Sequence, residues 1–141
     1  MLKDTFTFKG PLGDIECLVE PNRSDNNAVL VMAHGFRGSR DSGGRAAGVA
    51  QQAAAHAAVV RFNFTGTQII SRQVEELRAV LAEVRRRQPG CKLFLLGRSL
   101  GGAASIITAA QDGALAGLIL WATPNNLRFT FRYVMTEDEY R

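Results

Sequence analysis

Cysteine is scarce in this sequence. Cys17 and Cys91 are its two cysteines, and they lie far apart in the chain. A disulfide-stabilised scaffold would need more cysteines in a shorter chain, so we expect two free, buried thiols. The N-terminus has no apolar signal core, and the longest nearly apolar stretch, 113–123, is too short to span a bilayer. We therefore expect no membrane span and a cytoplasmic location.

The sequence also lacks the signatures of several ligand classes. Its net charge is +4, but the densest basic run, Arg85 to Arg87, ends a predicted helix, where cations complement the helix dipole. No nucleic-acid motif accompanies this run, so we expect no nucleic-acid partner. The phosphate-loop pattern G-x-x-x-x-G-K-[ST] is absent, and no cluster of metal-ligating residues is present. We expect neither a metal nor an organic cofactor.

What is present is an alternation of strand and helix patterns. With 141 residues, 46% of them hydrophobic, the chain is long enough for one domain with a core. Alternating apolar residues over 5–20, interrupted by a Gly-Pro-Leu-Gly turn, predict a β-hairpin. The strands expected after it are 28–33, 58–64, 92–96 and 115–122, and the helices are 45–57, 69–87 and 99–111. This order predicts an α/β fold: a mostly parallel sheet with an N-terminal β-hairpin and helices on both faces.

The strongest chemical motif is Gly97-Arg98-Ser99-Leu100-Gly101. A buried strand leads directly into this turn, and a helix begins at once. Such a turn presents a serine hydroxyl above the sheet as a nucleophile, and the flanking Gly97 and Gly101 avoid side-chain clashes. The backbone N–H of Leu100 can stabilise an oxyanion. The alternative is a glycine-rich turn in which Ser99 only caps the helix.

A second motif, His34-Gly35-Phe36-Arg37-Gly38-Ser39, follows another buried strand. Here the chain resembles the α/β-hydrolase superfamily, from the hairpin through Pro124, and most closely its small-esterase and serine aminopeptidase-like branch. The resemblance implies that the backbone N–H of Phe36 is the second oxyanion donor. It also implies that His34 and Gly35 support the turn, with His34 in a structural role. Segment 61–66 resembles the family pattern R-x-D-x-R-G, with Asn63 and Thr65 at the acidic and second basic positions.

The residues that would activate the serine are missing. In this family an acid and then a histidine follow the nucleophile. No histidine follows Ser99, Asp112 lies near the end of a predicted helix, and Glu137, Asp138 and Glu139 lie in the C-terminal tail. We therefore interpret 1–124 as the N-terminal portion of a hydrolase core and 125–141 as the start of a cap, lid or linker. Residues 118–121 would then form an exposed apolar sheet edge.

The resemblance implies a serine hydrolase that acts on a small-molecule ester, thioester or amide through an acyl-enzyme. These 141 residues alone are expected to be nearly inactive, because the triad acid and base are absent. Two alternatives remain open: acyl transfer by the same residues, and a non-catalytic binding or interaction module that keeps the turn as a structural element. Nothing in the sequence specifies the oligomeric state.

Overall fold

The computed structural model describes residues 1–35, 38–66 and 68–128. Six strands in this part of the chain form one sheet in the order β1-β2-β4-β3-β5-β6. Their bounds are β1 Phe6–Gly10, β2 Gly13–Glu20, β3 Ala28–Ala33, β4 Ala58–Phe62, β5 Lys92–Arg98 and β6 Gly117–Trp121.

The sheet is mixed but mostly parallel. The β1–β2 hairpin is antiparallel and pairs with β4, also antiparallel, whereas β3, β4, β5 and β6 run parallel to one another. The predicted parallel sheet with an N-terminal hairpin is thus confirmed. Because parallel strands end at the same edge, the loops after β3, β4 and β5 meet there, which is where ligands bind in open α/β sheets.

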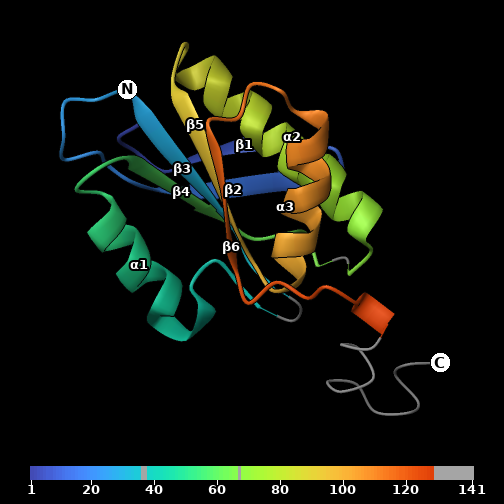
Figure 1. Cartoon of the computed structure of the whole chain (residues 1–141). Coiled ribbons are helices and arrows are strands. Elements are labelled where there is room, and N and C mark those ends of the chain that lie inside the picture. Colours follow the sequence, from blue (N-terminus) through green and yellow to red (C-terminus); the bar gives the residue numbers. More distant parts are fainter. Residues whose placement is uncertain (36–37, 67, 129–141) are drawn as a thin grey trace.

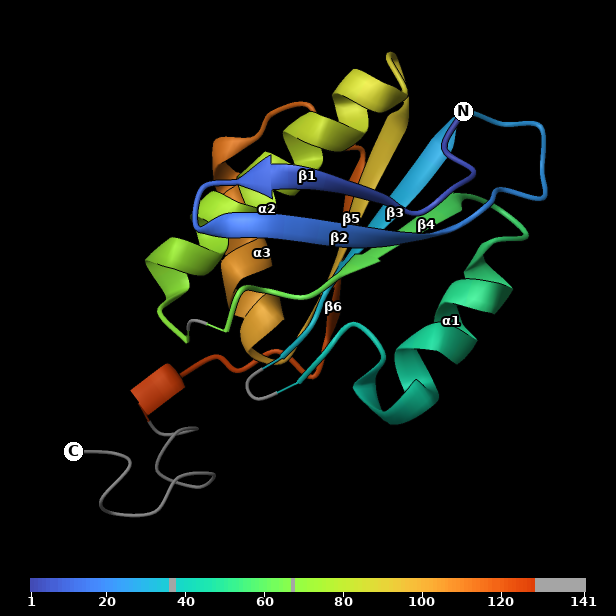
Figure 2. The same ribbon diagram turned by 180° about the vertical axis from the view of Figure 1, so that it is seen from behind.

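Helices cover both faces of the sheet (Figures 1 and 2). A short 3₁₀ turn, Ser42–Gly44, leads into α1, Arg45–Ala53, on one face, while α2, Ile70–Arg87, and α3, Leu100–Gln111, lie on the other. The helix expected over 45–57 ends at Ala53. Its last residues instead form tight turns, with the N–H of His56 bonded to the carbonyl of Ala53 at 2.9 Å, which redirect the chain into β4.

The core has two parts, one on each face of the sheet. The larger part joins alternate strand residues such as Val31, Val60 and Leu95 to the apolar stripe of α2. The smaller part packs Leu30, Met32, Val59 and Leu96 against Ala46 and Ala50 of α1. These two alanines lie four residues apart on one helical face, so α1 can approach the sheet closely.

Strand β6 lies at one edge of the sheet, beside β5. Ile119 is 49% exposed and Leu120 is 45% exposed, while Leu118 and Trp121 are half-buried. The expectation of an exposed apolar edge at 118–121 is therefore confirmed for the two central residues.

Both cysteines are free thiols. Cys17 is buried in β2, whereas Cys91 is half-buried and lies just before β5. In the described residues, no helix combines the length and the apolar character that a membrane crossing would need.

Candidate functional site

Ser99 is the single residue between the end of β5 and the start of α3, and its backbone has a conformation that serine rarely adopts. Its φ is 52° and its ψ is −122°. A positive φ is strained for a residue with a Cβ atom, and it persists where the surrounding structure enforces it. The N–H of Ser99 donates to the carbonyl of Trp121 at 2.9 Å, and its own carbonyl accepts from the N–H of Gly102 at 2.9 Å. The edge strand and the first turn of α3 therefore hold this conformation from both sides.

Gly97 and Gly101 allow the elements around Ser99 to approach one another. A Cβ atom on Gly97 would lie 2.5 Å from both the Cα of Gly102 and the Oγ of Ser105. A Cβ atom on Gly101 would collide with the backbone carbonyl oxygens of Ala33 and His34. The start of α3 thus packs directly on the end of β3, which no larger residue would permit.

The turn after β3 lies against Ser99. A Cβ atom on Gly35 would lie 2.8 Å from the Cβ of Ser99 and 3.4 Å from its Oγ. The two motifs singled out in the sequence therefore meet at the carboxyl edge of the sheet. Phe36, the expected second oxyanion donor, lies outside the described residues. Leu100 is the first residue of α3, so its N–H has no acceptor within the helix.

His34 is fixed by two backbone partners. Its Nδ1 donates to the carbonyl of Gly35 at 2.9 Å, and its Nε2 accepts from the N–H of Phe64 at 3.0 Å. Burial lowers the pKa of the imidazole below its ordinary value. Its ring also stands edge-on to that of Phe64, with centroids 5.0 Å apart. With both nitrogens engaged and the ring neutral, His34 connects the turn after β3 to the loop after β4 and has no free nitrogen for the Ser99 proton.

The other titratable groups named in the sequence lie elsewhere. His56 is exposed and lies in the turns between α1 and β4, at the opposite edge of the sheet from Ser99. Asp112 follows α3 and makes two hydrogen bonds to Arg85, at 2.6 and 3.0 Å, which hold its pKa below the ordinary value. Burial raises the pKa of the Cys17 thiol to about 12. None of these groups can activate Ser99, and Glu137, Asp138 and Glu139 lie outside the described residues.

A buried carboxylate that was not predicted from the sequence forms hydrogen bonds with the loop after β4. Glu76 of α2 is fully buried and accepts from the N–H of Thr65 at 3.0 Å and from its hydroxyl at 2.9 Å. Asn63 accepts the N–H of Arg40 at 2.7 Å. The two positions at which 61–66 departs from the family pattern therefore both make hydrogen bonds in this loop. The available signal was that Gln73 and Glu76 lie on the buried side of an otherwise apolar helical stripe.

An open pocket of about 590 Å³ gives access to Ser99. Its lining is Gly35, Gly38, Ser39, Ser42, Gly43, Arg98, Ser99 and Ala122. The first turn of α3 has no acidic residue, so the positive end of its dipole faces the serine without compensation. This arrangement can seat a carbonyl compound and stabilise negative charge on its oxygen. In the described residues, no group of three or more His, Cys, Asp or Glu side chains could hold a metal ion.

No family model matches the chain, and no curated protein matches it by sequence. Solved structures do match it. A structure described as an α/β serine hydrolase homologue from Coxiella burnetii is 24% identical, covers 88% of this chain and has a TM-score of 0.78. An α/β serine hydrolase from Xanthomonas campestris, described as lacking a lid, is 24% identical, covers 90% of this chain and has a TM-score of 0.78.

A solved structure with lower sequence identity superposes on this chain with a similar TM-score. An esterase from Pyrococcus furiosus is 14% identical, covers 95% of this chain and has a TM-score of 0.82. The chain spans 64%, 65% and 56% of the Coxiella, Xanthomonas and Pyrococcus proteins, which is less than two thirds of each.

Proposed function

Because the chain has the fold of the α/β hydrolases, we propose that Ser99 is the nucleophile of a serine hydrolase acting on a small ester, thioester or amide. The observation that carries this proposal is the strained positive φ of Ser99 at the strand-to-helix turn. A helix cap needs no such conformation, whereas a serine presented above a sheet does.

In the proposed reaction, the Oγ of Ser99 attacks the substrate carbonyl while a base takes the hydroxyl proton. The carbonyl oxygen becomes an oxyanion, which accepts hydrogen bonds from the N–H of Leu100 and the N–H of Phe36. When the tetrahedral intermediate collapses, the leaving group departs with the proton and the acyl group stays on Ser99. Water then releases the acid and restores the hydroxyl. If another alcohol or thiol replaced this water, the result would be acyl transfer.

The base for this reaction is proposed to come from outside these 141 residues. His34 has both ring nitrogens bonded, His56 lies at the wrong edge of the sheet, and no histidine follows Ser99. We accordingly retain residues 1–124 as the N-terminal portion of a hydrolase core and 125–141 as the beginning of a cap, lid or linker. A cytoplasmic location is part of the same proposal and is supported by the two free thiols.

Acylation of Ser99 by p-nitrophenyl acetate tests the proposal. Without an added base, the 141-residue protein should hydrolyse p-nitrophenyl acetate about 10⁴- to 10⁶-fold more slowly than an enzyme with a complete triad. Added imidazole supplies an external base, so it should increase acetylation of Ser99, measured by mass spectrometry of the intact protein and its peptides. Ser99→Ala should abolish that acetylation, and Ser42→Ala, which removes another serine of the same pocket, should not.

Two outcomes would contradict parts of this proposal. Rapid turnover that depends on Ser99 without imidazole would show that the base lies within the chain. Absence of acetylation at Ser99, together with no labelling by a fluorophosphonate when imidazole is present, would favour the non-catalytic binding module.

A further inference from the structure

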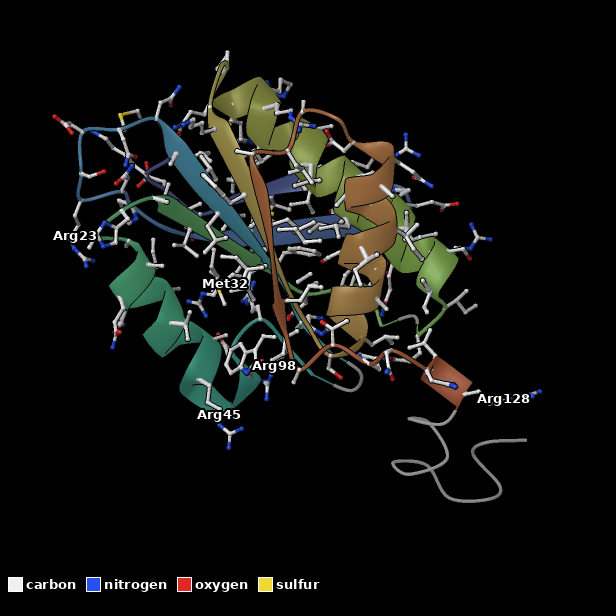
Figure 3. All side chains as sticks on the ribbon, in the orientation of Figure 1. Arg23, Met32, Arg45, Arg98 and Arg128 are labelled. Atoms are coloured by element: carbon white, nitrogen blue, oxygen red, sulfur yellow. The ribbon has the colours of Figure 1, made fainter. Side chains whose placement is uncertain are left out.

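Arg98 precedes Ser99 and extends over the face of the sheet that α1 covers. Successive strand residues point to opposite faces, and Leu96, two residues earlier, packs in the core beneath α1. Figure 3 shows Arg98 at the carboxyl ends of the strands, near Arg45 and the first turn of α1. Arg98 lines the same pocket as Ser99, so its charge lies beside the proposed nucleophile.

The guanidinium of Arg98 rests on an aromatic surface. Its Cζ lies 4.8 Å from the centre of the Trp121 ring, and Arg98 and Trp121 are register partners on β5 and β6. Such stacking is favourable and restricts the side chain while leaving its N–H donors free. Among the described residues, the guanidinium of Arg98 has this contact with Trp121 and no ion pair or hydrogen bond.

Three other arginines whose side chains lie near the sheet are paired with carboxylates. Arg61 contacts Asp41 at 3.0 Å, Arg40 contacts Glu16 at 2.6 Å, and Arg85 contacts Asp112 at 2.6 Å. Among the described residues that line this pocket there is no carboxylate, and Asp41 of the adjoining loop is paired with Arg61. Arg98 is therefore a half-buried cation that stacks on an aromatic ring, and the described lining of its pocket supplies no counter-ion.

We propose that Arg98 binds a carboxylate group of the substrate and so selects acyl compounds that carry a negative charge close to the bond attacked by Ser99. The proposal rests on the proposed function of Ser99 and specifies its substrate class. A planar guanidinium presents two parallel N–H donors that match the two oxygens of a carboxylate. Because Trp121 restricts the side chain, little conformational freedom is lost when the carboxylate binds.

Equilibrium binding can test this substrate class without requiring catalysis. Trp121 is the single tryptophan of the chain, so its fluorescence reports directly on the Arg98 environment. Ser99→Ala protein would be titrated with monomethyl succinate and with dimethyl succinate, which differ by one negative charge. The half-ester should bind about tenfold more tightly than the diester.

Three variants in the Ser99→Ala background locate the effect. Arg98→Gln should remove the preference for the half-ester, and Arg98→Lys should keep part of it because the charge remains. Arg72→Gln is the matched control: it removes an exposed arginine that pairs with Glu75 on α2, so the preference should be unchanged. Thermal unfolding of each variant would verify that it is folded.

Equal binding of the half-ester and the diester by Ser99→Ala protein would overturn the proposal, whatever the variants do. So would a preference that survives in Arg98→Gln. These binding results are independent of the chemistry at Ser99. A charge preference without acetylation or fluorophosphonate labelling at Ser99 would keep the Arg98 site and reject the hydrolase. Acetylation at Ser99 without a charge preference would reject the Arg98 site alone.

Discussion

At the scale of the residue, Gly101 is the glycine whose added Cβ atom would lie nearest to backbone atoms of another element. A Cβ atom there would collide with the carbonyl oxygens of Ala33 and His34, both backbone atoms of the β3 end. Gly101→Ala must push α3 away from β3, and we expect it to lower the free energy of unfolding by about 1–3 kcal/mol. Urea denaturation followed by far-UV circular dichroism would measure the change.

Gly48 provides the matched control for Gly101→Ala. It lies in α1, and a Cβ atom on it would meet no atom within 4 Å. Gly48→Ala should therefore raise the free energy of unfolding by about 0.5–1 kcal/mol, because alanine loses less backbone freedom in a helix. If Gly101→Ala were as stable as the unmodified protein, the close approach of α3 to β3 would be wrong.

The sequence indicated the local turns around Ser99 but could not indicate their long-range partners. Glycines next to a serine, between a strand and a helix, predict a tight turn because the pattern is local. The bonds from Ser99 to the Trp121 carbonyl and from Phe64 to His34 join segments far apart in the chain. Only the folded topology brings such groups together, and periodicity carries no information about it.

At the scale of the element, α2 does more than cover the sheet. The buried carboxylate of Glu76 accepts hydrogen bonds from the N–H and the hydroxyl of Thr65. The preceding residue, Phe64, donates its N–H to Nε2 of His34. Helix α2 thereby fixes the loop after β4 and, through it, the turn against Ser99. Sequence periodicity correctly predicted this helix, and it also places Glu76 within the apolar stripe, whereas Glu75 of the same helix is exposed.

Burial raises the pKa of Glu76 above its ordinary value of 4.5, which makes stability depend on pH. Between 4.5 and the raised value, the folded protein binds more protons than the unfolded protein, so this group makes stability fall as pH rises through that range. Glu76→Gln keeps an acceptor for the Thr65 N–H and removes the titration. Relative to the unmodified protein, the variant should become progressively more stable as pH rises from 4.5 through the raised pKa of Glu76.

Urea unfolding at several pH values would measure that difference. Glu76→Ala is the informative companion, since it leaves the Thr65 N–H without its acceptor and should cost about 1–3 kcal/mol at every pH. A difference between Glu76→Gln and the unmodified protein that stayed constant with pH would mean that the Glu76 pKa is not raised.

At the scale of the whole molecule, the resemblance suggested by two short motifs is confirmed as a resemblance of fold. The alternation of strands and helices predicted the layers and the mostly parallel pairing, because buried parallel strands are continuously apolar. The sheet order β1-β2-β4-β3-β5-β6 was not stated from the sequence, since pairing between distant strands leaves no mark in a local pattern.

The exposed β6 edge predicts self-association of the 141-residue protein. Unpaired strand edges with apolar side chains associate, and a lysine on the edge opposes this. Ile119→Lys should therefore lower the weight-average molecular mass that sedimentation equilibrium measures at high protein concentration. It should not reduce the free energy of unfolding, because Ile119 is already 49% exposed. Ile69→Lys, at an exposed isoleucine before α2, is the control and should leave association unchanged. Equal association of both variants would rule out the edge as the cause.

The hydrogen bond from Ser99 to Trp121 joins the proposed nucleophile to the outermost strand of the sheet. Edge strands open locally at a smaller free-energy cost than central strands, and each opening of β6 would release the Ser99 amide to exchange its hydrogen with solvent. The populations of docked β6 and of the strained Ser99 geometry are therefore thermodynamically linked. A further segment of polypeptide or a second protein that packs against β6 would therefore raise the fraction of molecules in which Ser99 has its strained geometry.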